Sequence, residues 1–447
     1  MRPRRARRLG RAGSPLYPQR SATDLGLTCR TVGRGSGLTL ALIVHCEPYN
    51  GIDEFARANA CGLRHGNLFG TIAFGPVLQL PHRLRPEASV IVSEPIILGI
   101  ETSCDETAAA VVQCGTRVLS NVIATQHELH RRYTGVVPEI ASRAHLQRIV
   151  PVIREALSEA GVGYDDLDAV AVGHRPGLIG SLLVATSAAK ALAWSLSVPL
   201  VGIDHIVAHL HAGLLDAEPV EFPAIGLVVS GGHTSLFLVH RPLEVDLLGK
   251  TIDDAAGEAF DKAAVILGLG YPGGPALDGL AQTGSDCACD LPVAMLGRDS
   301  LDFSFSGLKT ALLYAVCGQP QRRGRGHGFP RDASQLSQQQ KADFAASFQR
   351  AAVTAIMRKL MRAMERFEVR TLLVGGGVSA NSRLRAELHE LAQRRGLDLR
   401  LPKTEYCLDN AAMIAGLAAA KFAVGDFDDW SLSASTQSEI ADGRVIV

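Results

Sequence analysis

Several common function motifs are missing from the 447-residue sequence, and each absence narrows the choice. There is no Walker A motif and no GxGxxG between a strand and a helix, so neither a P-loop nor a Rossmann nucleotide site is expected. The nine cysteines include no CxxC pair, which argues against a zinc ribbon and favours reduced thiols. No run of 18 apolar residues occurs. The apolar stretch at 182–200 contains Lys190 and is typical of a core helix.

Basic residues are concentrated at one end of the chain, although the net charge is zero. Residues 1–94 contain 13 Arg, no Lys and 6 acidic residues, a net charge of +7, so residues 95–447 carry −7. The main part of the chain therefore needs a local basic patch or a basic partner if it is to bind nucleic acid.

Three interpretations apply to residues 1–94. The favoured one is a disordered extension or a mis-assigned start, because no Met occurs between Met1 and Met295 while a clear domain pattern begins near residue 96. A targeting segment is the second. It would be either a transit peptide, which implies a mitochondrial location, or a signal peptide around the apolar residues 38–44. A genuine additional domain is the third.

From residue 96 onward, short apolar runs alternate with helical patterns, which predicts an α/β fold. The pattern restarts near residue 224, which predicts two related halves. Strands are expected at 96–100, 108–112, 168–172, 200–203, 224–229, 235–239 and 370–374. Helices are expected at 144–160, 181–195 and from about 382; in the first, Leu146, Ile149, Val150, Ile153 and Leu157 are expected to share one face.

Three turns rich in glycine or acidic residues follow predicted strands, at 99–107, 229–234 and 375–381. Small residues in such turns let backbone N–H groups approach phosphate oxygens, and the third turn precedes a helix N-terminus. One such turn alone is more often a plain hairpin. Three of them together predict a nucleotide-binding cleft.

A metal site is predicted from two histidines four residues apart. On a helix, His205 and His209 share a face, and Asp409 is a candidate carboxylate ligand. Two His and one Asp suit Fe²⁺ or Zn²⁺, whereas a lone HxxxH is more often a pair of surface histidines. His211 is expected to point away. A zinc metalloprotease would have Glu directly after the first His, and Ile206 in that place argues against peptide hydrolysis.

An acidic helix is expected within 251–267, with Asp254, Glu258 and Asp261 on one face. The face is either solvated or, because alanines surround it, packed against a flat ligand. The Pro-Gly turn at 270–275 and Asp278 after it would suit ribose hydroxyls.

Two further features have open roles. Lys309, in SFSGLKT, is either an ordinary solvated lysine or a contact for an RNA phosphate. Residues 318–335 are rich in Gly, Pro and Arg and predict an exposed loop.

Together these segments closely resemble the tRNA N6-adenosine threonylcarbamoyltransferase family, formerly called O-sialoglycoprotein endopeptidases. The resemblance covers about residues 96–425, and its motifs follow one another in the family's order. They are GIETSCDET, GVVPEIASRAH, IDHIVAHLHAG, LVVSGGHTSL, DDAAGEAFDKAA, GYPGGPALD, FSFSGLKTA, GGGVSANSRLR and CLDNAAMIA.

This resemblance implies the actin-like ATPase fold of sugar kinases and heat-shock ATPases, with two duplicated lobes and a central cleft. The first lobe would span 95–222 and the second 223–405, with 406–447 returning to the first. The family activity is transfer of a threonylcarbamoyl group from L-threonylcarbamoyl-AMP to N6 of adenosine 37 in tRNAs that read ANN codons, with release of AMP.

The resemblance also assigns residues by their positions in the motifs. The metal ligands fall on His205, His209 and Asp409, and the ion would be one Fe²⁺, with Zn²⁺ as the alternative. Asp105 and Glu106 match residues needed for activity, and one of them is the expected general base. The adenylate contacts fall on Val228, Val229, Ser230, Gly231, Gly232, Asp261, Gly274, Asp278 and Asn381.

The expected partners are tRNA, a paralogous actin-like subunit and a small P-loop ATPase, in the cytoplasm of a bacterium and away from membranes. Two loop sequences depart from the family pattern, at 174–177 (HRPG) and at Thr134, where the family usually has Gly. A small-molecule kinase of the same fold and a non-catalytic partner subunit are the alternatives. Neither would need the two histidines and Asp409.

Overall fold

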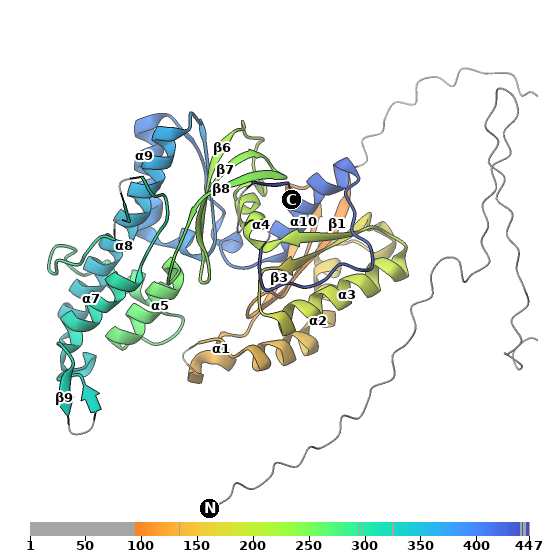
Figure 1. Cartoon of the computed structure of the whole chain (residues 1–447). Helices are drawn as coiled ribbons and strands as arrows, with labels where there is room; N and C mark the ends of the chain where they lie inside the picture. The colour runs from red at the N-terminus through yellow and green to blue at the C-terminus, as the bar shows by residue number, and fades with distance from the viewer. Residues whose placement is uncertain are drawn as a thin grey trace, which may run out of the picture. The chain divides into compact units, whose positions relative to one another are not determined.

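The structure is a computed structural model that describes residues 94–133, 135–294, 296–297, 299–323, 326–438, 440 and 444–446. The predicted extension at 1–94 therefore lies outside the described residues, apart from Glu94. The described part contains two mixed β-sheets with helices beside them (Figure 1). The predicted α/β fold class is confirmed.

Five strands form the first sheet in the order β3-β2-β1-β4-β5. β1 pairs antiparallel with β2 and parallel with β4, and the outer pairs continue these directions. The inner strands are buried on both faces because helices cover both sides, so their sequences are almost continuously apolar. The strands are β1 (Ile96–Glu101), β2 (Glu106–Gln113), β3 (Arg117–Thr125), β4 (Ala169–Arg175) and β5 (Leu200–Asp204).

The second sheet repeats this arrangement. Its order is β12-β11-β6-β7-β8-β13, with β6 antiparallel to β7 and parallel to β11. The series β8-β7-β6-β11-β12 therefore matches β3-β2-β1-β4-β5 in both order and direction. The strands are β6 (Ala224–Val229), β7 (Thr234–Arg241), β8 (Glu244–Lys250), β11 (Thr371–Gly375), β12 (Asp398–Arg400) and β13 (Arg444–Ile446). This match confirms the predicted duplication and the actin-like fold.

Ten α-helices surround and separate the two sheets in the described part. They are α1 (His127–His130), α2 (Pro138–Ala160), α3 (Ile179–Leu196), α4 (His205–His211), α5 (Ala256–Leu267), α6 (Gly273–Ala281), α7 (Ser306–Cys317), α8 (Gln338–Arg366), α9 (Ser382–Arg395) and α10 (Ala411–Val424). Helices α2 and α3 share a core with one face of the first sheet. Helices α5 to α9 share another core with one face of the second sheet.

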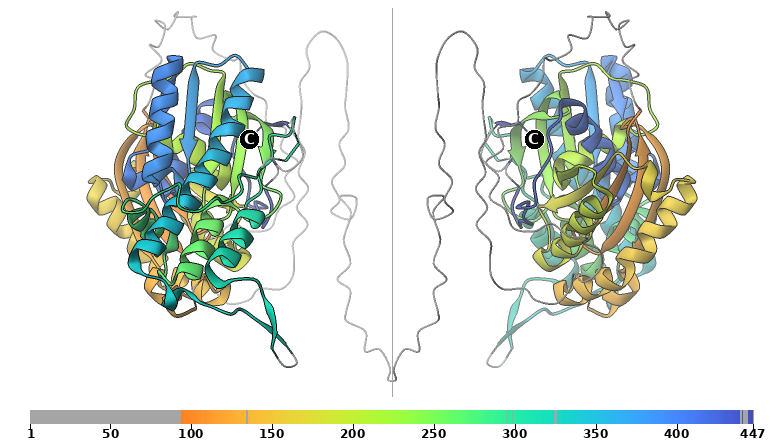
Figure 2. Two further views of the ribbon diagram at one scale, coloured as in Figure 1. Left: turned by 90° about the vertical axis from the view of Figure 1, so that its left-hand side faces the viewer. Right: turned by 90° about the vertical axis from the view of Figure 1, so that its right-hand side faces the viewer.

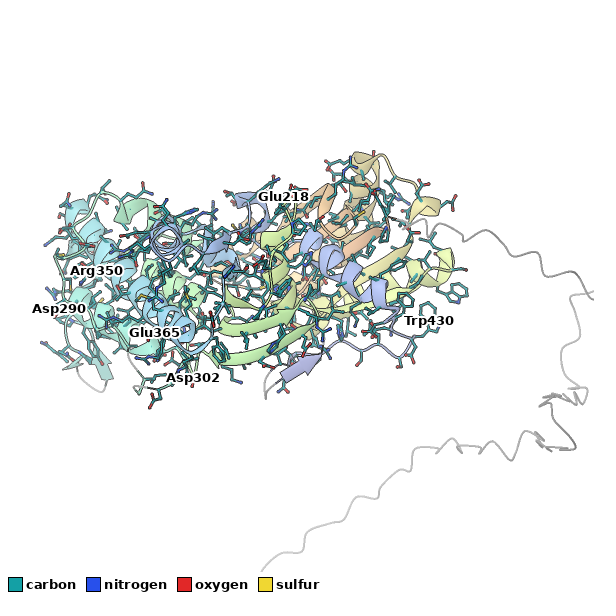
Figure 3. All side chains as sticks on the ribbon, turned by 90° about the horizontal axis from the view of Figure 1, so that it is seen from above. Glu218, Asp290, Asp302, Arg350, Glu365 and Trp430 are labelled. Atoms are coloured by element: carbon teal, nitrogen blue, oxygen red, sulfur yellow. The ribbon has the colours of Figure 1, made fainter. Side chains whose placement is uncertain are left out.

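A third core lies between the sheets and is formed mainly by α4 and α10. We call it the central core. It joins Ile97 and Ala110 of the first sheet to Val228 and Phe237 of the second through residues such as Ile414. Figure 3, viewed from above, shows the C-terminal helix between the strands of the two sheets. The residues just before α4 and α10 are thus held in the middle of the molecule.

Close packing in the central core depends on a glycine in β1. A Cβ at Gly99 would overlap the carbonyl oxygen of Ala411 and lie 2.9 Å from the backbone nitrogen of Ala415. Only glycine lets α10 lie this close to the strand. This contact fixes the first turn of α10, and with it the loop that precedes it.

Helix α2 is longer than predicted and buries a different set of residues. It begins at Pro138, whose fixed φ suits a first helical position, and ends at Gly161 with a left-handed φ of 65°. Ile149, Ile153 and Leu157 are buried as expected. Leu146 and Val150 are 69% and 50% exposed, so only part of the predicted helical face is buried. They lie at the margin of a face centred on His145, Ile149, Val152 and Ala156.

By length and composition alone, α3 is apolar enough to cross a membrane. Core helices of globular proteins also meet these two criteria. The helix packs against the first sheet and α2, and six of its residues are buried, namely Ser181, Leu182, Ala185, Thr186, Ala189 and Ala193.

Residues after α10 contact both sheets. Asp428 forms a bridge with Leu200 of β5, and the carbonyl of Trp430, labelled in Figure 3, accepts a hydrogen bond of 2.8 Å from Lys190. Strand β13 instead pairs with β8, so the end of the chain joins the second sheet. The prediction that residues 406–447 return to the first lobe did not include this pairing of β13 with the second sheet. The lobe boundaries at 222/223 and 405/406 stay predictions.

The Arg-rich segment 318–335 includes two short strands, β9 (Gln321–Arg323) and β10 (Gly326–Gly328). They pair antiparallel, and Figure 2 shows the hairpin extending away from the helices that flank it.

Candidate functional site

Two helices bring the three predicted metal ligands together. His205 and His209 lie one turn apart on α4, and Asp409 lies in the loop just before α10. Asp409 Oδ1 is 3.4 Å from His205 Nε2 and 3.2 Å from His209 Nε2. Both histidines are buried, while the Asp409 side chain is 21% exposed. One side of the group is therefore open to a ligand.

The start of α4 is fixed by its capping residue. Asp204 Oδ1 accepts hydrogen bonds from the backbone N–H groups of Ile206 and Val207, at 2.9 and 3.4 Å. This cap orients the first turn, on which His205 lies. His211 hydrogen-bonds the carbonyl of Gly115 at 2.9 Å, so it points away from the group as predicted.

His205 is oriented from behind by the first acidic turn. Its Nδ1 lies 3.0 Å from Glu101 Oε2 and 3.3 Å from Ser103 Oγ. The carboxylate holds the proton on Nδ1, which leaves Nε2 free to bind a metal. Burial alone would lower the pKa of His205, but Glu101 and Asp409 raise it well above its usual value.

For Asp409 the effects are reversed. Burial alone would raise its pKa, but His205 and His209 hold this pKa well below the usual range. The site is thus arranged around a positive charge, because the buried carboxylate of Glu101 and the partly exposed carboxylate of Asp409 flank His205. A divalent ion satisfies this arrangement. Within the described residues, Nδ1 of the buried His209 has no hydrogen-bond partner, and the only polar contact of Nε2 is the 3.2 Å approach to Asp409, which suits a metal shared by the two side chains. Two imidazoles and one carboxylate with open positions fit a divalent transition metal.

The second and third glycine turns pack against each other beside the metal group. A Cβ at Gly375 would overlap the carbonyl oxygen of His209, and one at Gly376 would overlap that of Val229. Gly376 also has a φ of 90°, which disfavours any other residue. These contacts place the turn after β6 directly beside α4.

Only part of the predicted adenylate run is open to a ligand. Val228 and Val229 are fully buried in β6, so only their backbone could contact a substrate. Ser230 Oγ accepts a hydrogen bond of 3.2 Å from the N–H of His233, which closes the turn. Gly231 and Gly232 are exposed, and a Cβ on either would meet nothing within 4 Å. The side of each residue on which a Cβ would project is therefore open, and a phosphate can approach the turn from that side.

The other predicted adenylate residues form two pairs. Asp261 accepts hydrogen bonds from the backbone N–H groups of Gly273 and Gly274, at 2.9 and 3.1 Å, and so fixes the start of α6. Asp278 is bound by the amide of Asn381 at 3.2 Å. It also accepts from Ser382 and Gln349. Asp278 and Asn381 thus join α6 to the start of α9.

The expected acidic helical face was partly wrong. Helix α5 begins at Ala256, so Asp254 precedes it and cannot share a helical face with Glu258 and Asp261. Asp254 instead forms ion pairs with Lys262 at 2.9 Å and with Lys309 at 2.7 Å.

Asp105 and Glu106 form a separate group with His127. His127 Nε2 lies 3.3 Å from Glu106 Oε1 and 4.0 Å from Asp105 Oδ2, and the latter oxygen has no hydrogen-bond partner among the described residues. Burial raises the pKa of Glu106 to about 8; His127 opposes this shift and Asp105 reinforces it. The contact with Glu106 in turn raises the pKa of His127.

His127 also connects the two halves of the chain. Its ring packs edge-on against Tyr271, with the centroids 6.0 Å apart. Tyr271 belongs to the Pro-Gly turn that leads into Gly274 and α6. The acidic pair therefore lies close to the turn expected to hold the adenylate.

Two cavities border this region. The larger, about 700 Å³, lies along β3 and the loop before Asp409, and Glu106, His127 and Leu408 line it. The smaller, about 440 Å³, is lined by Gly232, His233 and Ile206 together with the segment at 436–438. Burial lowers the pKa of His233 to about 4, and His205 and His209 reinforce this shift.

Three residues of the site were missed at the level of sequence, namely Glu101, His127 and His233. Glu101 and His233 lie inside quoted motifs, directly beside residues that were singled out, so their positions at strand ends were a usable signal. His127 had none, because its place depends on how a four-residue helix packs.

The departures at 174–177 contact the base of α4. His174 hydrogen-bonds the carbonyl of Ser433 at 2.9 Å, and Arg175 Nε lies 3.6 Å from Asp204 Oδ2. These residues thus fix the C-terminal segment and the α4 cap. Thr134 lies outside the described residues.

Comparison with known proteins identifies the family of the chain. The family profile described as tRNA N6-adenosine threonylcarbamoyltransferase matches residues 117–416. The chain belongs to this family. A protein of that name from Symbiobacterium thermophilum is 52% identical over 76% of this chain and 96% of its own length. Others from Syntrophomonas wolfei and Bacillus cereus are 47% and 46% identical, over 77% of this chain and 98% and 96% of their own lengths.

Among solved structures, HypF of T. kodakarensis aligns with 75% of this chain and 48% of its own, at 15% identity and a TM-score of 0.48. A likeness this distant adds nothing about the activity of the family member described here.

Proposed function

We propose that this protein transfers the threonylcarbamoyl group of L-threonylcarbamoyl-AMP to N6 of adenosine 37 in tRNAs that read ANN codons, and releases AMP. Membership of the family and the relatives that carry this name support the activity. One structural observation assigns this activity to particular residues. His205, His209 and Asp409 form a largely buried group beside an open glycine turn.

The donor fits the second sheet. Gly231 and Gly232 offer backbone N–H groups to its phosphate, because nothing in the structure fills the space above them. Asp278 and Asn381, at the joined ends of α6 and α9, are suited to the ribose hydroxyls. Held this way, the mixed anhydride lies between the metal group and Glu106, and positioning alone supplies much of the rate.

In the transfer step, each residue of the site has a separate role. The N6 amine attacks the carbamoyl carbon, the new N–C bond forms, and the bond from that carbon to the phosphate oxygen breaks. The bonding electrons leave with AMP. One proton must leave N6, and Glu106 is the proposed acceptor, since its carboxylate lies beside the donor turn and lines the larger cavity. Asp105, whose Oδ2 has no hydrogen-bond partner among the described residues, lies next to it.

His205, His209 and Asp409 would hold one divalent ion, and Fe²⁺ is proposed over Zn²⁺ because of the family resemblance. Such an ion would supply Lewis-acid polarisation of the donor's carbonyl or carboxylate oxygen. Glu101 keeps His205 in the tautomer that binds it.

A paralogous actin-like subunit is the proposed protein partner, with a small P-loop ATPase. Helices α2 and α3 support this proposal, because they expose large apolar side chains that a monomer would bury. These are Leu146, Val150, Ile179, Leu183 and Trp194. A cytoplasmic location is proposed as well, since the six cysteines in the described part are free thiols, which fit a reducing compartment.

The test is transfer of labelled threonylcarbamoyl to unmodified ANN-decoding tRNA by the full chain with its partner proteins. Product is expected from the wild type and not from His205→Ala. His389→Ala, an exposed histidine on α9, is the matched control and should keep full activity. ATP-dependent phosphorylation of a small molecule, with no transfer to tRNA, would overturn the proposal in favour of a kinase.

A further inference from the structure

The larger cavity has no role in holding the donor. It is a groove of about 700 Å³ between the edge strand β3 and the loop that leads to Asp409. Strand β3 contributes Leu119, Asn121 and Ile123 to its wall. The loop contributes Thr404, Glu405, Tyr406 and Leu408. None of the residues expected to bind the adenylate lines it.

One end of the groove reaches the reacting groups. Glu106, the proposed proton acceptor, lies in its wall, and Leu408 is the residue directly before Asp409. His127 lies beside Glu106, with its ring 29% exposed. Tyr271, on the other side of His127, belongs to the turn that leads to the adenylate residues. A group bound at this end of the groove would therefore lie beside Glu106 and close to Asp409.

The chemistry of the wall suits a purine base. RNA bases that react are splayed out of their stack, placed against aromatic side chains and read by hydrogen bonds to their edges. His127 offers a partly exposed ring, and Asn121 offers an amide, the group that best matches the edge of adenine. Asn121 Oδ1 is buried and has no hydrogen-bond partner among the described residues, so the side chain must turn to bring its amide to a base.

Basic side chains lie near the end of the groove away from Glu106, where Asp216 accepts from the N–H of Val118 and pairs with Lys403. Arg117 precedes the first lining residue of β3, and Lys403 precedes the first lining residue of the loop; both are exposed. Lys403 is paired with Asp216 at 2.8 Å, an exposed ion pair that a phosphate can replace. Contacts of this kind position a nucleic acid without reading its sequence.

We infer that this groove is the acceptor subsite, which receives the adenosine splayed out of the tRNA loop and presents its N6 to Glu106. The inference rests on the proposed function and names where its second substrate binds. The volume lies within the range of built ligand pockets, and the donor residues leave the groove free.

The test uses an anticodon stem-loop RNA with 2-aminopurine at position 37, bound to the full chain with its partner proteins and without donor. Because 2-aminopurine fluoresces more strongly when it leaves its stack, wild type should enhance the signal. Asn121→Trp fills the groove and should abolish the enhancement. Thr436→Trp, in the wall of the smaller cavity, is the matched control and should keep it.

Steady-state kinetics gives the second readout. Asn121→Trp should raise the KM for tRNA about tenfold or more, because it removes the stacking position of the base. The affinity for AMP, used as a probe of the donor site, should stay within about twofold, since no donor residue is touched. Circular dichroism and the melting temperature show whether the variant is folded, and Asn121→Ala, which cannot block the groove by bulk, provides a second test of the lost amide.

The other possible outcomes distinguish a failure of the acceptor subsite from a failure of the proposed function. If wild type transfers the group but Asn121→Trp keeps the enhancement and the KM, the groove is not the acceptor subsite and the proposed function stands. If Thr436→Trp loses the enhancement instead, the base enters the smaller cavity, and the inference is overturned. If wild type enhances the signal without any transfer, the groove binds the base and the proposed function fails.

Discussion

Replacing Glu101 by Gln tests whether the residue behind His205 controls metal binding. Glu101 is fully buried, and its two oxygens face two donors: Oε1 accepts from the N–H of Ser103, and Oε2 lies 3.0 Å from His205 Nδ1. A glutamine has one acceptor oxygen and one NH₂ group. Its NH₂ must therefore oppose one of these donors.

Either orientation of the amide weakens the site. If the NH₂ faces His205, the ring can accept only as the tautomer with its proton on Nε2, which blocks the metal. If it faces Ser103, a buried N–H loses its partner. Changes to residues that orient metal-binding histidines typically weaken affinity about 10- to 100-fold, or about 1.4 to 2.8 kcal/mol.

The assay is competition for the metal between the apo-protein and a fluorescent chelator, with Fe²⁺ under anaerobic conditions and with Zn²⁺. Ser103→Ala is the matched control. It removes only a hydroxyl 3.3 Å from His205 and should cost about threefold. Near-ultraviolet circular dichroism checks that both variants are folded. Wild-type affinity in Glu101→Gln would refute the role of the carboxylate and the assignment of the tautomer.

Three further predictions follow from the same geometry. Because the pKa of Glu106 is raised to about 8 and a base must be deprotonated, single-turnover transfer should increase with pH from about 7 to 9 and then level off. Glu106→Gln should be slow and flat, and an equally steep profile in this variant would exclude Glu106 as the base. His209→Ala should lose the bound metal in elemental analysis, whereas His211→Asn should retain it and lower stability by about 1 to 3 kcal/mol in urea unfolding, by the loss of a buried hydrogen bond; equal metal content in the two would contradict the ligand set. Gly231→Val should change stability by less than about 0.5 kcal/mol yet weaken AMP binding, because its side chain enters open space, while Gly257→Ala should destabilise by about 1 to 3 kcal/mol, since its Cβ would lie 2.7 Å from a backbone oxygen. Scanning calorimetry of the two glycine variants measures their stability, and AMP titration measures their binding. Strong destabilisation of Gly231→Val would contradict the prediction.

Much of the fold could be predicted from apolar periodicity in the sequence. The strands that were missed have physical reasons for lacking this pattern. The inner strands β1, β4, β6 and β11 are buried on both faces, so they appear in the sequence as continuous apolar runs between turns. Strand β3 was missed because it is an edge strand whose residues, RVLSNVIAT, are only half buried. Strand β8 lies between β7 and β13 and was missed because it carries charged residues and is only partly buried.

The site was predictable where its residues are close in sequence and less so where they are not. His205 and His209 follow from helical spacing alone. Asp409 lies about 200 residues away, and only the resemblance and then the packing of α10 on β1 connect it to them. The error at Asp254 came from including it in a helix expected within 251–267, whereas α5 begins two residues after it, at Ala256; the Pro-free acidic sequence does not reveal this start.

The place of α10 in the chain affects how the protein is made. Helix α10 fills the central core, which the first sheet needs on one face, yet it spans Ala411–Val424 and is synthesised after the whole second sheet up to β12. On the ribosome, β1 to β5 must therefore wait, with apolar residues uncovered, until almost the entire chain has emerged. Asp409 arrives in the same final stretch. Metal loading is thus a late event of biogenesis, and a chain that stops before α10 leaves its two histidines without their carboxylate.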